Sequence, residues 1–272
     1  MALPPDRPLQ EGQPTSAREK RERRRRKDAG HPRWEDRDYY VLKWIGTQGV
    51  IRFDQLRQLL GRESEDLDDW HAVLSPSATR NAIDRWEAEH LVNSAHIMPR
   101  EPKYSWLSNA GLQFVELELP HYRPRSSDMP FMLACNQVRL HLELQSLTDV
   151  EEFGDFSECN WVSQRELQQD SDPERAAHIS STQFWTQKRG TLAIEVVIES
   201  DAQTEATMQG YAQGKLGDYS EVWYFALSSQ LPLLDATRAQ LQRTGVNVST
   251  IYTFNADTIL IPPPKRTRKD KG

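Results

Sequence analysis

Residues 177–201 read AHISSTQFWTQKRGTLAIEVVIESD, and this stretch decides the fold of the C-terminal half of the chain. Two alternating runs flank residues 188–190, which is typical of two strands joined by a tight turn. The second run is nearly continuous in Ala, Ile and Val, which indicates a strand that is buried on both faces. Carboxylates are rarely buried, yet this strand carries Glu195 and Glu199. We therefore expect the two glutamates either to hold a metal ion or to be the remains of a metal site.

Helices and strands alternate around this pair of strands. Upstream, residues 131–147 have the apolar spacing of a long helix. Downstream, the pattern predicts a helix at 202–214, a strand at 221–226, a helix at 234–244 and a strand at 246–254, while 259–261 could be a final edge strand or no element. Because helices between strands make crossover connections, we expect residues 131–262 to form an α/β domain with a central mixed sheet.

Residues 34–120 follow a different pattern. Apolar stripes predict two helices, the first of them ended by Gly46 and Gly49, and Ser75-Pro76 then provides a cap and a first-turn proline for a third helix. VNSAHIM and KYSWL predict a hairpin around residues 99–102, and LSNAGLQFVEL predicts a closing helix. Three helices followed by a hairpin are the order of a winged helix-turn-helix, and HYRPRSSDMP at 121–130 has the composition of a linker.

The third helix of such a module normally enters the major groove of DNA. Its polar side and the wing tip carry donors suited to base edges or phosphates, namely Ser77, Arg80, Asn81, Arg85, Arg100 and Lys103. Residues 34–125 nevertheless contain 11 basic and 15 acidic side chains, and Asp84 lies on the same side of the helix. Winged helices also bind proteins, so an interaction module or a transcription regulator remains an alternative.

Charge is distributed unevenly along the chain, whose overall net charge is −6. Residues 1–27 carry +5 and residues 265–272 carry +4, which leaves −15 for the part between them. We expect 1–33 to be a disordered basic arm and 263–272 a basic tail. Such arms often lie along phosphate backbones, so we expect DNA contacts from the run Arg23, Arg24, Arg25, Arg26 and Lys27. A solubilising tail or a nuclear-import signal is the alternative.

Composition excludes several other classes of protein. Cys135 and Cys159 are the only cysteines, which argues against a disulfide framework or a thiolate zinc site. No apolar run approaches the ~20 residues that cross a bilayer, and residues 1–16 lack the apolar core of a secretory signal. We expect a cytoplasmic protein with no membrane partner.

Several motifs occur in an order that resembles the replication-relaxation family. They are SWLSNAGL at 105–112, ACNQVRLHLEL at 134–144, NWVSQREL at 160–167, a histidine at 178, LAIEVVIE at 192–199 and a tyrosine at 211. The resemblance covers roughly residues 36–255. It implies a bacterial DNA-binding protein of a plasmid or mobile element, an accessory of replication or mobilisation that has protein partners in that complex. It also implies a restriction-endonuclease-like fold for the second domain.

The chain departs from the family pattern where the resemblance implies a metal site. Glu166 and Glu195 match the family's carboxylates. Four other positions differ. Gln164 replaces a glutamate and Ser181 replaces an aspartate. Val197 stands where the family has a second glutamate, and the family's lysine falls near Asp201.

A magnesium-dependent phosphodiesterase needs at least two converging oxygen ligands and a nearby cation. Glu195 and Glu199 share one face of their strand about 6–7 Å apart, so they can share a metal only if the strand bulges or another ligand bridges them. We therefore expect Glu166, Ser181, Glu195 and Glu199 to be vestigial, with no catalytic residue, metal or cofactor. The alternative is an active nicking or relaxing enzyme that uses Mg²⁺.

Overall fold

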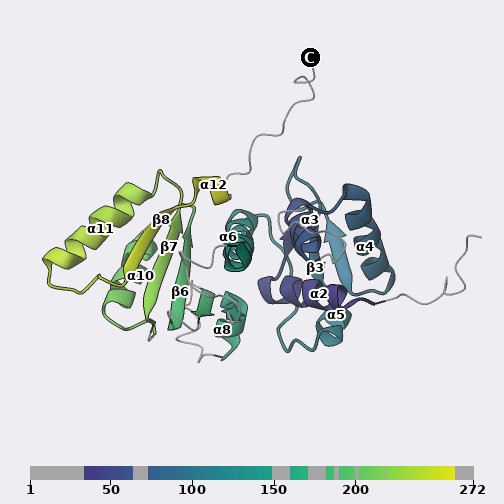
Figure 1. The fold of residues 1–272 in the computed structure, drawn as a ribbon, viewed down its shortest axis with the longest axis horizontal. Coiled ribbons are helices and arrows are strands. Elements are labelled where there is room, and N and C mark those ends of the chain that lie inside the picture. Colours follow the sequence, from purple (N-terminus) through teal and green to yellow (C-terminus); the bar gives the residue numbers. More distant parts are fainter. Residues whose placement is uncertain are drawn as a thin grey trace, which may run out of the picture. The chain divides into compact units, whose positions relative to one another are not determined.

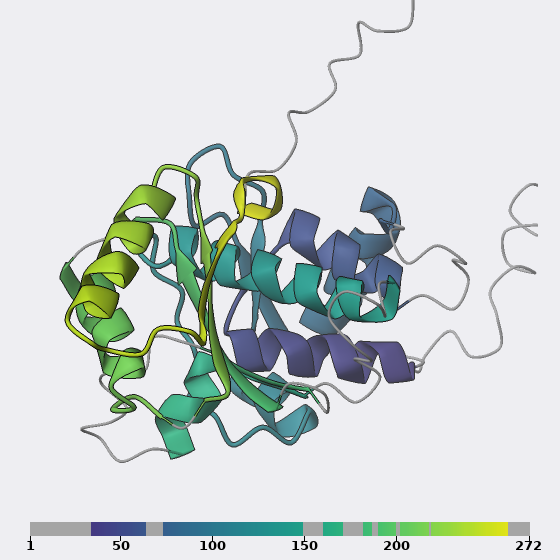
Figure 2. The ribbon, with the colours of Figure 1, turned by 60° about the vertical axis from the view of Figure 1, so that its left-hand side comes forward.

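The computed structural model describes residues 34–63, 73–148, 160–170, 182–186, 190–199, 202–217 and 219–260. The described residues from Asp36 onward belong to one compact unit that mixes helices with two small sheets (Figures 1 and 2). In chain order the elements are α2 (Asp36–Gln48), β1 (Ile51–Arg52), α3 (Phe53–Arg62), α4 (Pro76–Ala88), β2 (Val92–Ala95), β3 (Tyr104–Leu107), α5 (Asn109–Phe114), α6 (Met129–Thr148), β4 (Asn160–Val162), α8 (Gln164–Asp170), β5 (Thr182–Thr186), β6 (Gly190–Val197), α10 (Ala202–Ala212), β7 (Glu221–Ala226), α11 (Leu231–Arg243), β8 (Ile251–Asn255) and α12 (Asp257–Leu260). The expected mixture of α and β structure is confirmed.

The first sheet lies in the N-terminal part of this unit. Its three strands are antiparallel in the order β1-β3-β2, and α2, α3 and α4 precede the β2–β3 hairpin. The expectation that Gly46 ends the first helix is wrong, since α2 continues to Gln48. A glycine is favoured at this position inside the helix because a Cβ there would lie 2.5 Å from Leu117 Cδ1 and 2.9 Å from Leu107 Cδ1. Gly49, with φ of +93°, makes the turn instead.

Helix α5 is held against the turn between α4 and β2 by a close approach at Gly111. A Cβ at this position would lie 2.1 Å from the carbonyl oxygen of Leu91, closer than any side-chain carbon can come. Ser108 fixes the start of the helix, because its Oγ accepts from the backbone N–H of Gly111 at 3.0 Å. Only glycine therefore allows the hairpin and α5 to fold back in this way.

The second sheet has the order β4-β5-β6-β7-β8. Strands β4, β5 and β6 are antiparallel neighbours, whereas β6, β7 and β8 run parallel and are joined through α10 and α11. The expected mixed sheet with crossover helices is thus present. Helix α6 packs on one face around Ile194 and Trp223, and α10 and α11 pack on the other around Ala193 and Tyr224, as Figure 1 shows.

Two segments near the C-terminus differ from the expectations: one strand is present but starts later, and one segment is helical. The strand expected at 246–254 is shortened to Ile251–Asn255, because Asn247 Oδ1 accepts from the N–H of Ser249 at 3.0 Å and the N–H of Ile251 bonds back to Val248. These local bonds turn the chain before it can join the sheet. At 259–261, where a final edge strand or no element was expected, residues 259 and 260 belong to the short helix α12, which begins at Asp257, and residue 261 lies outside the described residues.

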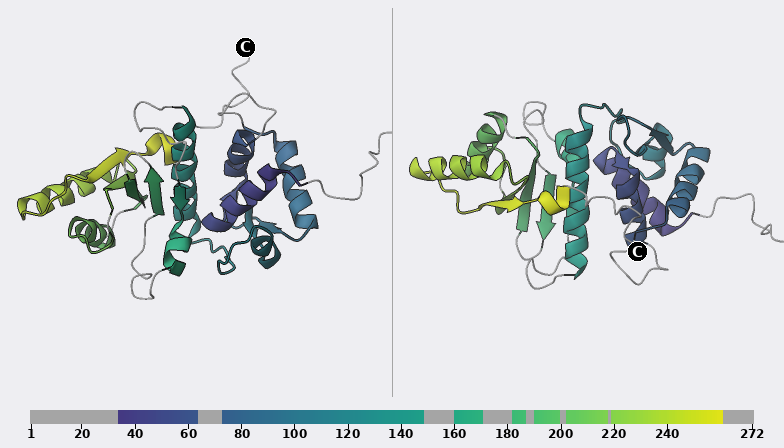
Figure 3. Two further views of the ribbon diagram at one scale, coloured as in Figure 1. Left: turned by 60° about the horizontal axis from the view of Figure 1, so that its bottom comes forward. Right: turned by 90° about the horizontal axis from the view of Figure 1, so that it is seen from above.

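Helix α6 lies between the C-terminal sheet and the N-terminal elements (Figure 3). It contacts the N-terminal elements through a buried polar network. Glu143 accepts from Arg62 at 2.8 Å, from Arg139 at 2.7 Å and from the indole N–H of Trp44 at 3.1 Å. Nearer the start of the helix, Asn136 Nδ2 donates to the carbonyl of Val50 at 2.7 Å. The expected separation into domains at 121–130 stays a prediction. The arm and tail at 1–33 and 263–272 lie outside the described residues.

Glu143 is ionised at neutral pH in this network. Burial alone would raise the pKa of its carboxyl group, but the charges of Arg139 and Arg62 and their hydrogen bonds outweigh burial, so that its pKa lies below the usual value. A carboxylate in this setting stabilises the fold above the pKa that it has in the unfolded chain, and the contribution is lost as the pH falls toward the folded-state pKa.

We predict that Glu143→Gln lowers the free energy of unfolding by about 3 kcal/mol at pH 7, because it removes the counter-charge of the buried Arg139 and one of the two counter-charges of Arg62, which keeps its pair with Glu63. Urea unfolding followed by circular dichroism measures this change. The deficit should shrink as the pH falls below about 4.3, the pKa of a glutamate in the unfolded chain, because the unfolded wild type then takes up a proton before the folded protein does.

Glu118→Gln is the matched control, since Glu118 is exposed and forms no ion pair with another described residue. Its unfolding free energy should stay within about 0.5 kcal/mol of the wild type. Equal effects of the two substitutions would contradict a special role for Glu143.

Candidate nucleic-acid interface and nuclease-like site

Helix α4 presents an exposed polar face. The helix begins as its sequence predicts, with Ser75 Oγ accepting from the N–H of Ala78 at 3.2 Å and Pro76 in the first turn. Its buried residues are Thr79, Ala82, Ile83 and Trp86. The opposite side exposes Ser77, Arg80 and Asn81, together with Asp84. Three of the six predicted DNA donors outside the arm therefore share one solvent-facing surface, and an acid accompanies them.

Arg80 is oriented by an aromatic neighbour. Its guanidinium carbon lies 5.7 Å from the ring centroid of Phe53, the first residue of α3. The side chain remains exposed and makes no ion pair with another described residue. A guanidinium that stacks on a ring is restricted in direction yet keeps its donors for a ligand.

Arg85 has a structural partner. It donates to the carboxylate of Asp38, which is fully buried and also accepts from the indole N–H of Trp86 at 3.1 Å. The ion pair ties α4 to α2 and supplies the counter-charge that a buried carboxylate needs. The sequence predicts Arg85 as a DNA contact. In the structure Arg85 forms an ion pair with Asp38 and neutralises its charge.

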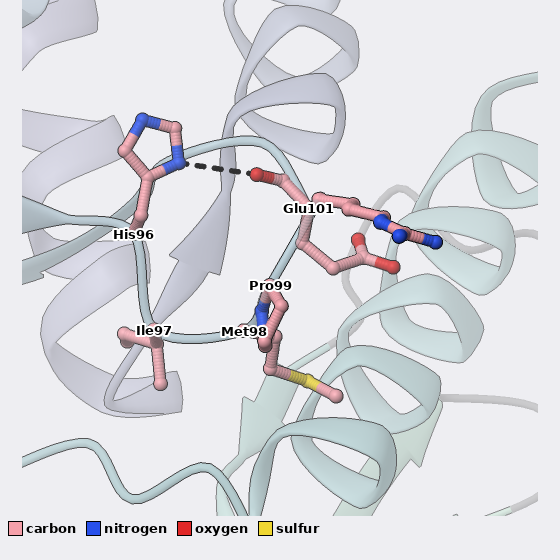
Figure 4. A pocket seen from close by; sticks show the side chains of 6 residues that line it. His96, Ile97, Met98, Pro99 and Glu101 are labelled. Carbon is pink, nitrogen blue, oxygen red and sulfur yellow. Dashed lines mark hydrogen bonds between the residues drawn. The ribbon is translucent and has the colours of Figure 1, made fainter.

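The loop between β2 and β3, residues 96–103, carries the other two predicted contacts. Arg100 and Lys103 are both exposed, and Arg100 has a φ of +66° at the tip of the turn. His96 Nδ1 lies 3.1 Å from the carbonyl oxygen of Glu101. This hydrogen bond, marked in Figure 4, closes the loop. The carboxylate of Glu101 pairs with Arg52 at 2.9 Å. Residues 96–101 line a hollow of about 550 Å³ beside the loop.

Glu195 is buried in the second sheet beneath α10. Its exposed fraction is 5%, and Tyr211 Oη donates to its Oε1 at 2.7 Å. Tyr224 is its partner on β7, and burial and then the charge of Glu195 raise the pKa of that phenol. The same two causes, in the same order, raise the pKa of the buried Cys135 thiol. Glu195 is thus a carboxylate held by a tyrosine inside the core.

Glu166 takes part in the folding of α8. Its Oε2 accepts from the N–H of Ser163 at 2.8 Å, while Ser163 Oγ accepts from the N–H of Glu166 at 3.3 Å. This reciprocal pair is a capping box, which satisfies two of the donors left open at a helix start. The spacing Ser-x-x-Glu could have been recognised as a capping box in the sequence.

The predicted acidic positions do not converge in the described part of the molecule. Glu199 is exposed beyond the end of β6, and Glu166 is bound to its own helix start. Ser181 lies outside the described residues. Across those residues, no three His, Cys, Asp or Glu side chains are grouped so that they could hold a metal ion. Glu195, Glu166 and Glu199 do not fit a Mg²⁺ site, which needs several oxygens around one point.

The residue next to the capping glutamate has a role that the sequence did not indicate. Arg165 donates to the carbonyls of Gly46 and Pro120, and its guanidinium lies 5.5 Å from the ring centroid of Tyr122. Burial lowers the pKa of Arg165, and the charges of Tyr122 and Glu166 partly offset this. Arg165 therefore fixes the segment that leads into α6.

No family model matches the chain, and a search of curated proteins finds none that is similar to it. The arm residues Arg23–Lys27 lie outside the described ranges. None of the described helices is both long and apolar enough to span a membrane.

We predict that Tyr211→Phe lowers the free energy of unfolding by about 1–3 kcal/mol, because the buried carboxylate of Glu195 loses a hydrogen-bond donor. Urea unfolding measures the change. Tyr252→Phe is the matched control, since Tyr252 is 40% exposed and should tolerate loss of its hydroxyl. A Tyr211→Phe variant as stable as the control would contradict the structural assignment of Glu195.

Proposed function

We propose that this protein binds duplex DNA and places α4 in the major groove. The order α2, α3, α4 and then a hairpin, with the antiparallel sheet β1-β3-β2, supports a winged helix-turn-helix for residues 34–120. The exposed face of α4 carries the proposal, because Ser77, Arg80 and Asn81 offer adjacent donors there. Arginine and asparagine are the side chains that read guanine and adenine by paired hydrogen bonds.

The proposal extends to the remainder of the chain through the family resemblance. Residues 131–262 would be a restriction-endonuclease-like domain, which the mixed sheet of β4 to β8 supports. The protein would be a cytoplasmic DNA-binding accessory in the replication or mobilisation of a bacterial plasmid or mobile element, together with protein partners. The basic arm and tail would add salt-dependent affinity for phosphate.

We further propose that the nuclease-like domain is non-catalytic. The support is that both matching carboxylates serve the fold: Glu195 accepts from Tyr211 in the core, and Glu166 caps α8. Withdrawing Glu195 to bind a metal would leave the half-buried phenol of Tyr211 without its acceptor, and withdrawing Glu166 would leave the start of α8 without its cap. The domain would then act as a docking or clamp surface for DNA bound elsewhere.

The alternative enzyme is tested directly with supercoiled plasmid. After incubation of the full chain with Mg²⁺ or Mn²⁺, we expect the plasmid to stay supercoiled on an agarose gel. Conversion to nicked circles by the wild type, with loss of conversion in Glu195→Ala and in the isosteric Glu195→Gln, would overturn the non-catalytic proposal.

For DNA recognition, we predict that Arg80→Ala and Asn81→Ala each lower the affinity for a selected duplex site, by about 1–3 kcal/mol for each bidentate hydrogen-bonded pair that is removed. Selection of binding sequences from a random pool, followed by fluorescence anisotropy, measures the change in affinity.

Gln242→Ala and Arg243→Ala are matched controls on the exposed end of α11, and their affinities should equal that of the wild type. If the wild type binds no duplex even at low salt, the DNA-binding proposal fails. An interaction module whose acidic body binds a basic protein would then be favoured.

A further inference from the structure

We propose that the β2–β3 loop and the segment 121–125 form one continuous surface for the phosphate backbone of duplex DNA. This surface, here called the basic strip, consists of Arg100 and Lys103 from the loop and Arg123 and Arg125 from the segment. The inference rests on the proposed DNA binding and adds two phosphate-binding residues from a region that its sequence marks only as a linker.

A shared apolar cluster places the two parts of the strip together. Val50, Tyr104 and Met129 form its buried centre. Met98 of the loop and Tyr122 of the segment both pack against that centre. Arg100 follows Met98 by two residues, and Arg123 follows Tyr122 directly. Since consecutive Cα atoms are about 3.8 Å apart, both arginines must lie within about two residue steps of the cluster.

Alternating burial directs the two new cations to the same side. Tyr122 and Pro124 are half-buried, whereas Arg123 and Arg125 are exposed. In an extended chain, alternate side chains point in opposite directions, so the two arginines share the solvent side. Pro124 favours this extended form, because the residue before a proline is kept out of the helical region.

The segment is already held in place before any ligand binds. Arg165 donates to the carbonyl of Pro120 and stacks on Tyr122, and Gln169 donates to the carbonyl of Glu118. Fixing the backbone in this way reduces the entropy that binding must otherwise remove. The strip therefore differs from a flexible linker, on which two arginines would add little affinity.

Two acids near the strip, Glu101 and Asp128, have partners. Glu101 pairs with Arg52, and Asp128 accepts from Ser127 Oγ at 2.7 Å. The four cations of the strip make no ion pair with another described residue. They form a cluster of positive charge on a body whose net charge between the arms is −15.

The chemistry of the strip favours nucleic acid over an acidic protein. Protein interfaces are anchored mainly by Trp, Tyr and Arg side chains that become buried on binding, so an arginine surface that binds a protein is expected to include exposed aromatic side chains. The large apolar side chains exposed on the described surface are Tyr39, Tyr40, Val73, Leu233 and Tyr252, and none of them belongs to the loop or to the segment. Arginine-rich, apolar-poor surfaces match phosphate oxygens instead.

The test compares the full-length wild type with Arg123→Gln/Arg125→Gln in fluorescence anisotropy with a duplex of about 30 base pairs across a NaCl series. Each phosphate that the variant no longer neutralises should reduce the slope of log K against log salt by about 0.9, so we expect a slope shallower by about 2 and an affinity roughly tenfold lower at about 0.1 M salt. Lys215→Gln/Arg243→Gln removes the same charge from exposed sites elsewhere and should leave the slope unchanged.

The outcomes separate the two proposals. Wild-type binding with an unchanged slope and affinity in Arg123→Gln/Arg125→Gln would overturn the basic strip and leave DNA binding through α4 intact. Absence of duplex binding by the wild type at low salt would defeat both. If both double variants lose the same affinity for duplex DNA, the effect is one of net charge and the basic strip is overturned. If Arg123→Gln/Arg125→Gln instead loses affinity only for polyglutamate, an acidic-peptide probe, the strip binds a protein partner and not DNA. Matching circular dichroism spectra and urea midpoints establish that both variants are folded.

Discussion

The arrangement of this protein depends on one buried carboxylate. Glu143, on α6, is only 11% exposed at its side chain and accepts from Arg62 on α3, Arg139 on its own helix and Trp44 on α2. Charges removed from water are stable only when their partners keep good geometry. The helix that covers the C-terminal sheet is therefore locked in position against the helices that precede the hairpin. A second buried acid, Asp38 on α2, holds α4 in the same way, because it accepts hydrogen bonds from Arg85 and Trp86.

Local sequence patterns predicted most helices and strands, but they did not predict the long-range side-chain contacts that hold these elements together. The β-rich run around Glu195 and the cap at Ser75-Pro76 correctly predicted β6 and α4, because both signals lie within a few residues of the element that they define. The Glu143 network joins residues up to 99 positions apart, and no periodicity connects them. Gly46 shows the same limit, since only the folded position of Leu117 explains why a glycine stays inside a helix.

The candidate sites were predictable to different extents. Exposure of Ser77, Arg80 and Asn81 follows from helical spacing alone, once the buried side of α4 is known. Arg85 sits at the edge of that polar face, and its partner Asp38 is 47 residues away, so spacing could not separate a ligand contact from an ion pair. Glu166 and Arg165 belong to one motif, yet one caps a helix and the other fixes a distant segment. A motif residue can thus serve folding in one chain even where its pattern suggests chemistry.

Gly111 shows that a residue shared by two proteins can reflect a shared fold without a shared ligand. The glycine of SNAGL is required because a carbonyl oxygen occupies the space that any side chain would need. Selection on shape alone would preserve it, whatever the hairpin touches. The same glycine in another protein would therefore indicate that the two backbones follow the same path. Whether the two proteins bind similar ligands would have to be judged from solvent-facing positions such as Arg80 and Arg123.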